Sequence, residues 1–317
     1  MSIPRLYVVH FTNRPVELAE KELALAPELG FDGVRVGYPP TEIMTADNKA
    51  VSPWAQRWID RDIARYKEMG LKVHLGLGGL FRDGATFEAN IEADKWVAER
   101  FASTFGPDEL SFHLSNEPSE YHRAKPDMPE WKLLVDEHFV RKCNTLVDIY
   151  DDSFKAHGYR LYGTTFEGGF DWTSPHKSVQ NYHYSMYLDR ICDTEQYRWI
   201  HYRTRQNFHL YVPNDVDAVN TAVQKCRLGL HCLGKYPQMR QGYAITEFNV
   251  RPASATVNQY NHGTRCAKIA KALLAMPELD FATVYCLAYH TEYSFMNPEG
   301  VRNEGRIKGW KKVFGLL

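Results

Sequence analysis

Two short stretches, Leu114-Ser115-Asn116-Glu117-Pro118 and Ala244-Ile245-Thr246-Glu247-Phe248, decide the fold that we predict for this chain. Each belongs to an apolar run that is typical of a buried strand, and each places a glutamate at the carboxyl end of that run. The two glutamates lie far apart in sequence, so only a fold can bring them together. We predict that they face each other across one cleft.

Apolar runs of strand length alternate with segments of helical period along the whole chain. The predicted strands are residues 5–11, 31–37, 71–77, 109–115, 159–165, 179–184, 241–248 and 281–288. The predicted helices are residues 15–25, 54–69, 86–105, 129–157, 194–207, 216–233, 260–275 and 306–314. Strands that alternate with helices form a parallel sheet, and this number of units in 317 residues indicates an α/β fold, the (β/α)8 TIM barrel.

The domain organisation follows from the same pattern. We find no linker rich in proline, glycine or serine, so we predict a single catalytic domain over residues 1–317. A doubly wound sheet is the competing fold. Against it, the turn after the first strand is His10-Phe11-Thr12-Asn13-Arg14, which lacks the G-x-G-x-x-G pattern of nucleotide-binding sheets.

The composition limits the class of partner. The net charge is −1, which gives no electrostatic reason to expect a nucleic acid or a membrane as partner. The six cysteines lack C-x-x-C spacing, so we interpret them as free thiols and predict neither a metal nor another cofactor. The amino-terminal stretch lacks a leader pattern. We therefore expect a cytoplasmic protein, or a secreted one whose signal peptide is absent from this sequence, and we make no prediction of its oligomeric state.

Polar residues at the carboxyl ends of the predicted strands are the candidates for the site, because (β/α)8 enzymes place their active sites there. These residues are Arg35, Asn116, Glu117, His183, Tyr184, Glu247, Tyr289 and His290. Side chains alternate along a strand, so Val34, Val36, Phe112 and Leu114 should face the helices. Arg35 and Glu117 then point inward with Glu247. The alternative is that Arg35 forms a structural ion pair and the glutamates are charges at helix N-termini.

Two carboxylates and an arginine at one site suit the hydrolysis of a glycosidic bond. One carboxylic acid protonates the leaving oxygen, while the other carboxylate attacks the anomeric carbon or activates a water molecule. An arginine beside the nucleophile favours its charged form. This reaction would use the side chains of Glu117, Glu247 and Arg35.

The same residues carry a family resemblance that spans the chain. Asn116-Glu117-Pro118 resembles the acid/base motif of the retaining β-glycosidases called clan A, and Thr246-Glu247-Phe248 resembles their nucleophile segment. The stretch Phe31-Asp32-Gly33-Val34-Arg35 is similar to the second strand of family 5 cellulases and mannanases. The carboxyl-terminal stretch at residues 297–313 also resembles the end of such barrels.

The resemblance implies a role for each matching residue. Glu117 is the acid/base, Glu247 is the nucleophile, Asn116 binds the sugar 2-hydroxyl, and Arg35 supports Glu247. The family places a His-x-Tyr pattern after the sixth strand, where a tyrosine contacts the nucleophile. Here Tyr182-His183-Tyr184 departs from that pattern, and we assign the contact to Tyr184 with His183 beside it.

Aromatic residues are candidates for sugar binding, because the C–H faces of sugars pack on aromatic rings. The tryptophan that many members carry on the eighth strand is absent, and Tyr289 stands near the end of that strand. Trp172, in a loop with Glu167, is the main candidate for a stacking platform, and Trp54 is a second. Either tryptophan could instead pack on the barrel. We expect His10, His74 and His113 to be core histidines.

Two other functions fit part of this pattern. A metal-dependent TIM-barrel enzyme, such as a sugar isomerase or a phosphodiesterase, would use Glu117, His183, Glu247 and His290 as ligands. A non-catalytic barrel that binds a glycan or a protein would need the aromatic residues without both carboxylates. We predict a retaining β-glycoside hydrolase, whose partner is a β-linked oligo- or polysaccharide.

Overall fold

The structure is a computed structural model that describes residues 5–77, 81–116, 137–164, 200, 202–234, 236, 241–251, 258–288 and 292–317. The chain forms two compact units, each built from separate stretches of sequence. The first unit comprises Met1–Val36, Phe208–Cys232 and Gly242–Leu317, and the second comprises Gly37–Asn207 and Leu233–Gln241.

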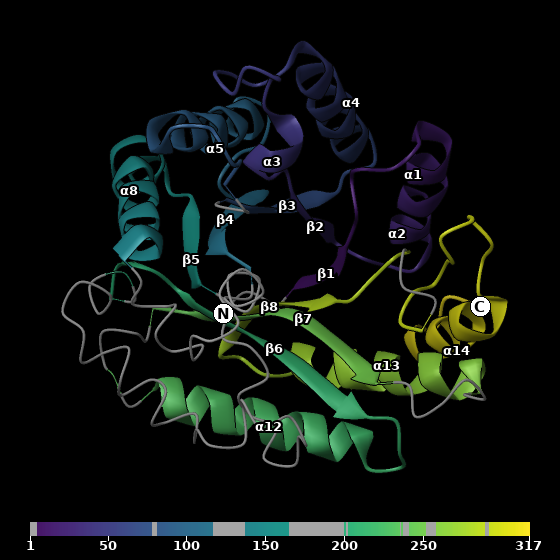
Figure 1. The fold of residues 1–317 in the computed structure, drawn as a ribbon. Coiled ribbons are helices and arrows are strands. Elements are labelled where there is room, and N and C mark those ends of the chain that lie inside the picture. The colour runs from purple at the N-terminus through teal and green to yellow at the C-terminus, as the bar shows by residue number, and fades with distance from the viewer. Residues whose placement is uncertain are drawn as a thin grey trace. The chain divides into compact units, whose positions relative to one another are not determined.

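The first unit contains parallel strands covered by helices (Figure 1). Its strands are β1 (Arg5–Val9), β7 (Tyr243–Arg251), β8 (Leu279–Val284) and most of β2 (Gly33–Gly37) and β6 (Gln206–Pro213). Its helices are α1 (Val16–Leu23), α2 (Leu25–Glu28), α12 (Ala218–Leu233), α13 (Gln259–Leu274) and α14 (Glu304–Phe314). Strand β1 pairs in parallel with both β2 and β8, and β8 pairs in parallel with β7.

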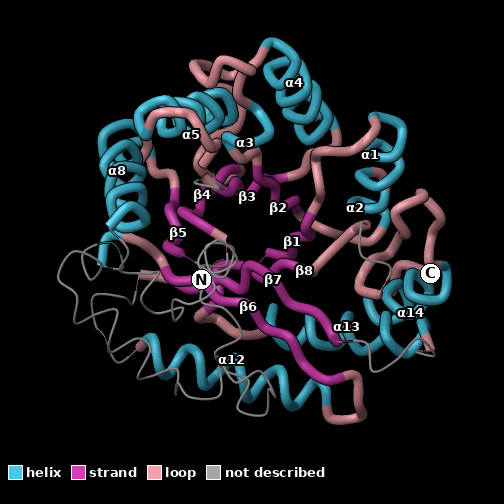
Figure 2. Tube along the Cα trace, viewed as in Figure 1, coloured by secondary structure: helices cyan, strands magenta, loops and turns pink. Residues whose placement is uncertain are grey.

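The second unit repeats the same arrangement of strand and helix. Its strands are β3 (Lys72–Gly76), β4 (Leu110–Ser115) and β5 (Arg160–Thr164). Its helices are α3 (Pro40–Ile43), α4 (Pro53–Glu68), α5 (Phe87–Ala102), α8 (Glu137–Ser153) and the short 3₁₀ helix η1 (Lys155–His157). Strand β4 pairs in parallel with β3 and β5, and the helices of this unit lie outside its strands (Figure 2).

The strand order establishes the fold class. All eight strands belong to one sheet with the order β5-β4-β3-β2-β1-β8-β7-β6. A parallel bridge joins Tyr162 of β5 to Arg205, the residue directly before β6, so the two ends of this order are connected. Strands in cyclic sequence order that alternate with helices form a (β/α)8 barrel, whereas a doubly wound sheet reverses its order at a switch point. The predicted fold class is confirmed; the single catalytic domain stays a prediction.

Local signals explain where the helices begin and end. Ser52 caps α4 by accepting a hydrogen bond from the Ala55 amide at 3.1 Å, and Pro53 occupies the first turn, where a missing N–H costs nothing. Thr86 caps α5 in the same way. Helix α14 ends at Gly315, whose φ of 71° is a conformation that glycine adopts without strain.

The predicted sixth strand was wrong. The sequence analysis assigned it to residues 179–184, which lie outside the described residues, whereas β6 of the barrel is Gln206–Pro213. The predicted helix at residues 194–207 therefore overlaps the first two residues of this strand. Pro213 is the last residue of β6. A proline at the end of a strand leaves the preceding ladder of hydrogen bonds intact, and short apolar runs do not distinguish the two structures by periodicity.

The alternation predicted for β4 is confirmed. Phe112 packs with its ring centroid 5.0 Å from that of Phe154, which follows α8, so this face of the strand meets the helices. On the other face, Ser111 hydrogen-bonds His74 of β3 with a distance of 2.9 Å between Oγ and Nδ1.

No helix in the described ranges has the length and apolar character that a membrane span requires.

Candidate active site

Glu247 lies in the middle of β7, at an irregularity of the strand. Ile245 pairs with Ala282, but the next pair, Phe248 with Val284, is shifted in register. The shift falls on Thr246 and Glu247. Such a bulge inserts an extra residue into a strand and redirects its side chains, and bulges are common beside active sites.

The carboxylate of Glu247 is buried against Arg35. Both residues are only 6% exposed, and Nη1 of Arg35 lies 2.5 Å from Oε1 of Glu247. The guanidinium balances the charge of a carboxylate that would otherwise be costly to bury. The prediction that these two residues converge is therefore confirmed. Arg35 forms an ion pair, as the structural alternative also required, but its partner is the predicted nucleophile.

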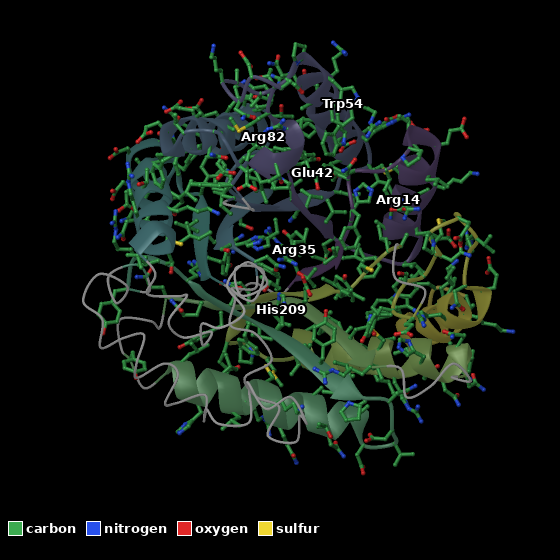
Figure 3. All side chains as sticks on the ribbon, viewed as in Figure 1. Arg14, Arg35, Glu42, Trp54, Arg82 and His209 are labelled. Carbon is green, nitrogen blue, oxygen red and sulfur yellow. The ribbon has the colours of Figure 1, made fainter. Side chains whose placement is uncertain are left out.

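The second oxygen of Glu247 accepts contacts from β6. The hydroxyl of Tyr211 donates to Oε2 at 2.8 Å, and Nδ1 of His209 lies 3.4 Å from the same oxygen. Figure 3 labels Arg35 and His209, which approach Glu247 from β2 and β6. Both oxygens of the carboxylate are thus held, each by a different strand, and the orientation of the side chain is fixed.

Sequence analysis missed Tyr211 and His209 because it placed the sixth strand elsewhere. The signal was present, since His209-Leu210-Tyr211 is the His-x-Tyr pattern that we sought after that strand. Tyr211 makes with Glu247 the kind of contact that we predicted for Tyr184, which lies outside the described residues.

Half-buried aromatic rings pack against the ring of Tyr211. The ring of Tyr211 lies 6.3 Å from that of Tyr285 and 6.0 Å from that of Tyr293, and Tyr285 and Tyr293 lie 6.0 Å apart. All are edge-to-face contacts, which is the arrangement that aromatic quadrupoles favour. Burial raises the pKa of Tyr293, against an opposing effect of Arg251. The guanidinium of Arg251 lies 6.0 Å from the centre of the Tyr211 ring.

In the second unit, strand β4 ends at Ser115, directly before Asn116. Ser115 is buried at the end of β4, and its hydroxyl donates to the carbonyl of Asn116 at 3.0 Å. Deeper in the unit, the rings of His74 and His113 stack with their centroids 4.7 Å apart. These two histidines and His10 are buried, as expected of core histidines.

The remaining predicted site residues are described only in part. The residues that lie outside the described ranges are Glu117, Glu167, Trp172, His183, Tyr184, Tyr289 and His290. Trp54 lies inside them, on α4; its side chain is 55% exposed and packs on Trp58 with ring centroids 5.1 Å apart. In the part of the chain that the structure describes, no group of three or more histidine, cysteine, aspartate or glutamate residues could hold a metal ion.

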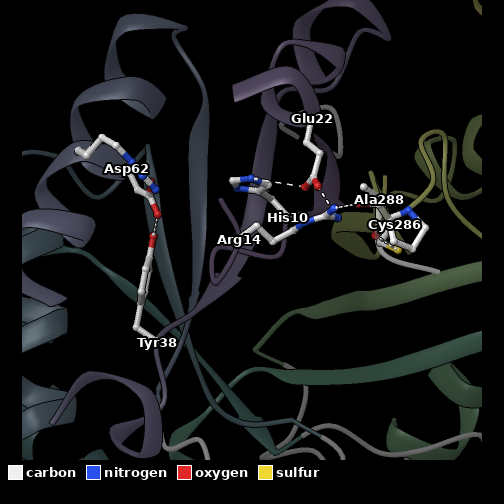
Figure 4. A network of polar contacts seen from close by, with 9 residues as sticks. His10, Arg14, Glu22, Tyr38, Asp62, Cys286 and Ala288 are labelled. Atoms are coloured by element: carbon white, nitrogen blue, oxygen red, sulfur yellow. Dashed lines mark hydrogen bonds and ion pairs between the residues drawn. The ribbon is translucent and has the colours of Figure 1, made fainter. Parts of the chain in front are cut away.

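Each unit also contains a buried polar network that does not include Glu247 (Figure 4). In the first unit, the buried carboxylate of Glu22 pairs with Arg14, and Nε2 of His10 lies 3.9 Å from the same carboxylate. Burial raises the pKa of Glu22 to about 7, although Arg14 acts in the opposite direction. In the second unit, the hydroxyl of Tyr38 donates to Asp62 at 2.9 Å. The first network joins the turn after β1 to α1, and the second joins the turn after β2 to α4.

Comparisons with known proteins agree with this fold. No protein-family model and no curated protein matches the sequence. Among solved structures, a β-glucosidase from Thermotoga maritima matches with a TM-score of 0.65 at 11% identity, over 99% of this chain and 97% of that chain. A GH39 enzyme from Xanthomonas axonopodis pv. citri matches with a TM-score of 0.64 at 13% identity, over 99% of this chain and 66% of that chain.

A third structure, a thermostable mutant of a xylanase from Cellvibrio japonicus, matches with a TM-score of 0.61 at 12% identity, over 98% of both chains. Sequence identities this low establish similarity of fold and not of activity. The resemblance that the sequence suggested is thus confirmed at the level of structure: the chain shares the (β/α)8 fold of the clan A glycoside hydrolases.

Proposed function

We propose that this chain is a retaining β-glycoside hydrolase that cleaves a β-linked oligo- or polysaccharide. The observation that carries the proposal is the setting of Glu247, whose two carboxylate oxygens are held separately by Arg35 and Tyr211. A buried carboxylate that pairs with an arginine and is fixed in orientation is suited to attack an electrophilic carbon. The fold shared with solved glycosidases supports the same activity.

In the first step, a carboxylate oxygen of Glu247 attacks the anomeric carbon of the sugar. The bond from that carbon to the leaving oxygen breaks, and Glu117, in its acid form, gives its proton to the leaving oxygen. The product is an ester between the sugar and Glu247. Arg35 and Tyr211 keep the carboxylate in place before the attack.

In the second step, Glu117 takes a proton from a water molecule, and the resulting oxygen nucleophile attacks the same anomeric carbon. The ester bond breaks, and Glu247 is released as a carboxylate. One water molecule is consumed per bond cleaved, and Glu117 has regained its proton. Two inversions at one carbon give net retention, which requires carboxyl groups about 5–5.5 Å apart.

The other site residues have proposed roles in binding the sugar. Asn116 would bind the 2-hydroxyl in the reacting subsite, and Trp172 and Tyr289 would contact sugar rings. Tyr211, rather than Tyr184, supports the nucleophile, because its hydroxyl bonds Glu247 directly. His183 and Tyr184 stay predictions as substrate contacts. The mechanism requires no cofactor.

The experiment that tests the proposal is hydrolysis of a panel of β-glycan polymers and aryl β-glycosides, with wild type and Glu247→Gln compared with and without EDTA. We expect hydrolysis that disappears in Glu247→Gln and does not respond to EDTA. The substitution is nearly isosteric, so circular dichroism should show an unchanged fold. Activity that EDTA abolishes would instead support the metal-dependent enzyme.

The stereochemistry of azide rescue tests which glutamate plays which role. Glu117→Ala should slow turnover yet still form the ester from substrates with good leaving groups. Added azide should then react with the ester to give a β-glycosyl azide. An α-glycosyl azide from the same variant would reverse the two assignments.

A further inference from the structure

The segment after β8 that carries Tyr293 is held by its backbone at three consecutive residues. Nη2 of Arg306 donates to the carbonyl of Glu292 at 2.8 Å, and Nη1 donates to the carbonyl of Ser294 at 2.6 Å. Between them, Nδ2 of Asn249 donates to the carbonyl of Tyr293 at 3.2 Å. Helix α14 and strand β7 therefore fix the segment together.

Arg306 is an unusual side chain to find in this position. It is 1% exposed, and burial lowers its pKa to about 10. Among the described residues its guanidinium donates to oxygens that carry no formal charge, including Oε1 of Gln259 at 2.6 Å. A buried charge without an opposite charge is costly, and an apolar residue of similar size would serve stability better. The fixed fork of the guanidinium instead spans two carbonyls of one loop.

Asn249 links this segment to the end of β8. The side chain is 1% exposed and lies two residues after Glu247 on the same strand. Besides the Tyr293 carbonyl, its Nδ2 also donates to the carbonyl of Tyr285. A single buried amide thus holds the backbone of both tyrosines that contact the ring of Tyr211.

These contacts connect Arg306 and Asn249 to the nucleophile through aromatic packing. Tyr285 and Tyr293 lie against the ring of Tyr211, and the hydroxyl of that ring donates to Glu247. A phenol that is packed on two sides keeps its hydroxyl in one direction, because displacement of the ring would lose both contacts.

We propose that Asn249 and Arg306 are positioning residues of the active site, which hold Tyr285 and Tyr293 against Tyr211 and so aim its hydroxyl at Glu247. The expected effect of these residues on catalysis rests on the proposed function. Their effect on the positions of the Tyr285 and Tyr293 rings does not depend on that function. The two parts need separate measurements.

The structural part is tested by ¹⁹F NMR of protein labelled with 3-fluorotyrosine, with the resonance of Tyr293 assigned from Tyr293→Phe. We expect Asn249→Ala and Arg306→Lys each to shift or broaden this resonance. The control is Arg302→Gln, which breaks the ion pair of Arg302 with Glu28 at the far end of the same loop without touching these carbonyls. A Tyr293 resonance that stays unchanged in both variants would overturn the proposal, whether or not the protein hydrolyses glycans.

The catalytic part is tested by a double-mutant cycle on the substrate that the panel identifies. We expect Asn249→Ala and Arg306→Lys each to lower kcat/KM about tenfold, and neither to lower it further in a Tyr211→Phe background, which already lacks the hydroxyl that they position. Losses that simply add to that of Tyr211→Phe would show that the two residues do not act through this hydroxyl, and would overturn the catalytic part of the proposal. If Arg306→Lys does not fold, Gln259→Ala, which removes one acceptor of the guanidinium, replaces it in both measurements.

Discussion

Arg35 and Glu247, 212 residues apart in sequence, form a buried ion pair with Nη1 2.5 Å from Oε1. Replacing one partner of such a pair leaves the other charge buried without compensation. We therefore expect Arg35→Met to lower kcat/KM by about 10²-fold or more, since electrostatic support of the reacting carboxylate is lost. Steady-state kinetics will measure this loss.

The control for Arg35→Met is the double variant that combines it with Glu247→Gln. Because both changes remove the same interaction, the double variant should be no less active than Glu247→Gln alone. It should also be more stable than Arg35→Met, since no uncompensated carboxylate is left buried. Equal melting temperatures for Arg35→Met and the double variant would contradict the importance of this ion pair.

Tyr211→Phe removes only the hydroxyl that bonds Glu247 and keeps the ring that contacts Tyr285 and Tyr293. We expect kcat to fall about tenfold, because a hydrogen bond to a charged group contributes about 1.5–3 kcal/mol. Tyr159→Phe is the matched control, since its hydroxyl donates to the Phe105 carbonyl at 2.8 Å in the second unit. That variant should lose about 1 kcal/mol of stability and keep its kcat. A large loss in Tyr184→Phe, with little in Tyr211→Phe, would restore our first assignment.

Glu22 makes the stability of the protein depend on pH. Its pKa is raised from 4.5 to about 7, chiefly by burial, so between these values the folded protein holds a proton that the unfolded chain has lost. The free energy of unfolding therefore falls as the pH rises through this window, by up to about 3 kcal/mol. Denaturant unfolding at pH 5 and pH 7.5 measures the change. Glu22→Gln should flatten this part of the profile, whereas Glu17→Gln, an exposed change on the same helix, should leave it as in the wild type.

His262 makes the stability of the protein depend on pH in the opposite direction to Glu22. Its Nε2 lies 2.9 Å from the Val250 carbonyl, and burial lowers its pKa from 6.5 to about 3. Between these values the unfolded chain binds a proton that the folded protein does not, so stability is lost as the pH falls, by up to about 5 kcal/mol. Urea unfolding of His262→Gln between pH 6.5 and pH 4 should show a shallower loss than the wild type. An unchanged slope, matching that of the exposed His231→Gln, would contradict this assignment.

The close packing of α13 on α14 depends on glycine. A Cβ atom built on Gly263 would overlap the carbonyl of Arg306, and one on Gly309 would overlap the carbonyl of Tyr260. We expect Gly263→Ala to destabilise the protein by about 2–3 kcal/mol, because two backbones must separate to admit the methyl group. Thermal unfolding measures the effect. Gly315→Ala is the comparison, since a Cβ there has nothing within 4 Å and only its φ of 71° is unfavourable. A smaller loss in Gly263→Ala than in Gly315→Ala would contradict the packing argument.

The sequence alone predicted most of the fold. Alternating strand and helix segments gave seven of the barrel strands at their observed places, because hydrophobic periodicity is a local property of the chain. The same periodicity predicted that Arg35 points inward on β2. The apolar run before Glu247 placed this residue on a strand, but the predicted strand end at residue 248 was too early, because β7 continues to Arg251.

What only the tertiary structure decided is how Glu247 is held. The sixth strand was misplaced because Gln206–Pro213 is a short segment of mixed polar and apolar residues, whose structure is determined by its place in the sheet rather than by its own pattern. Tyr211, His209 and the chain of contacts through Asn249 and Arg306 could not be predicted without that strand. Local sequence determines which face of a strand a side chain occupies, but the pairing of distant strands and the bulge at Glu247 determine which side chains meet.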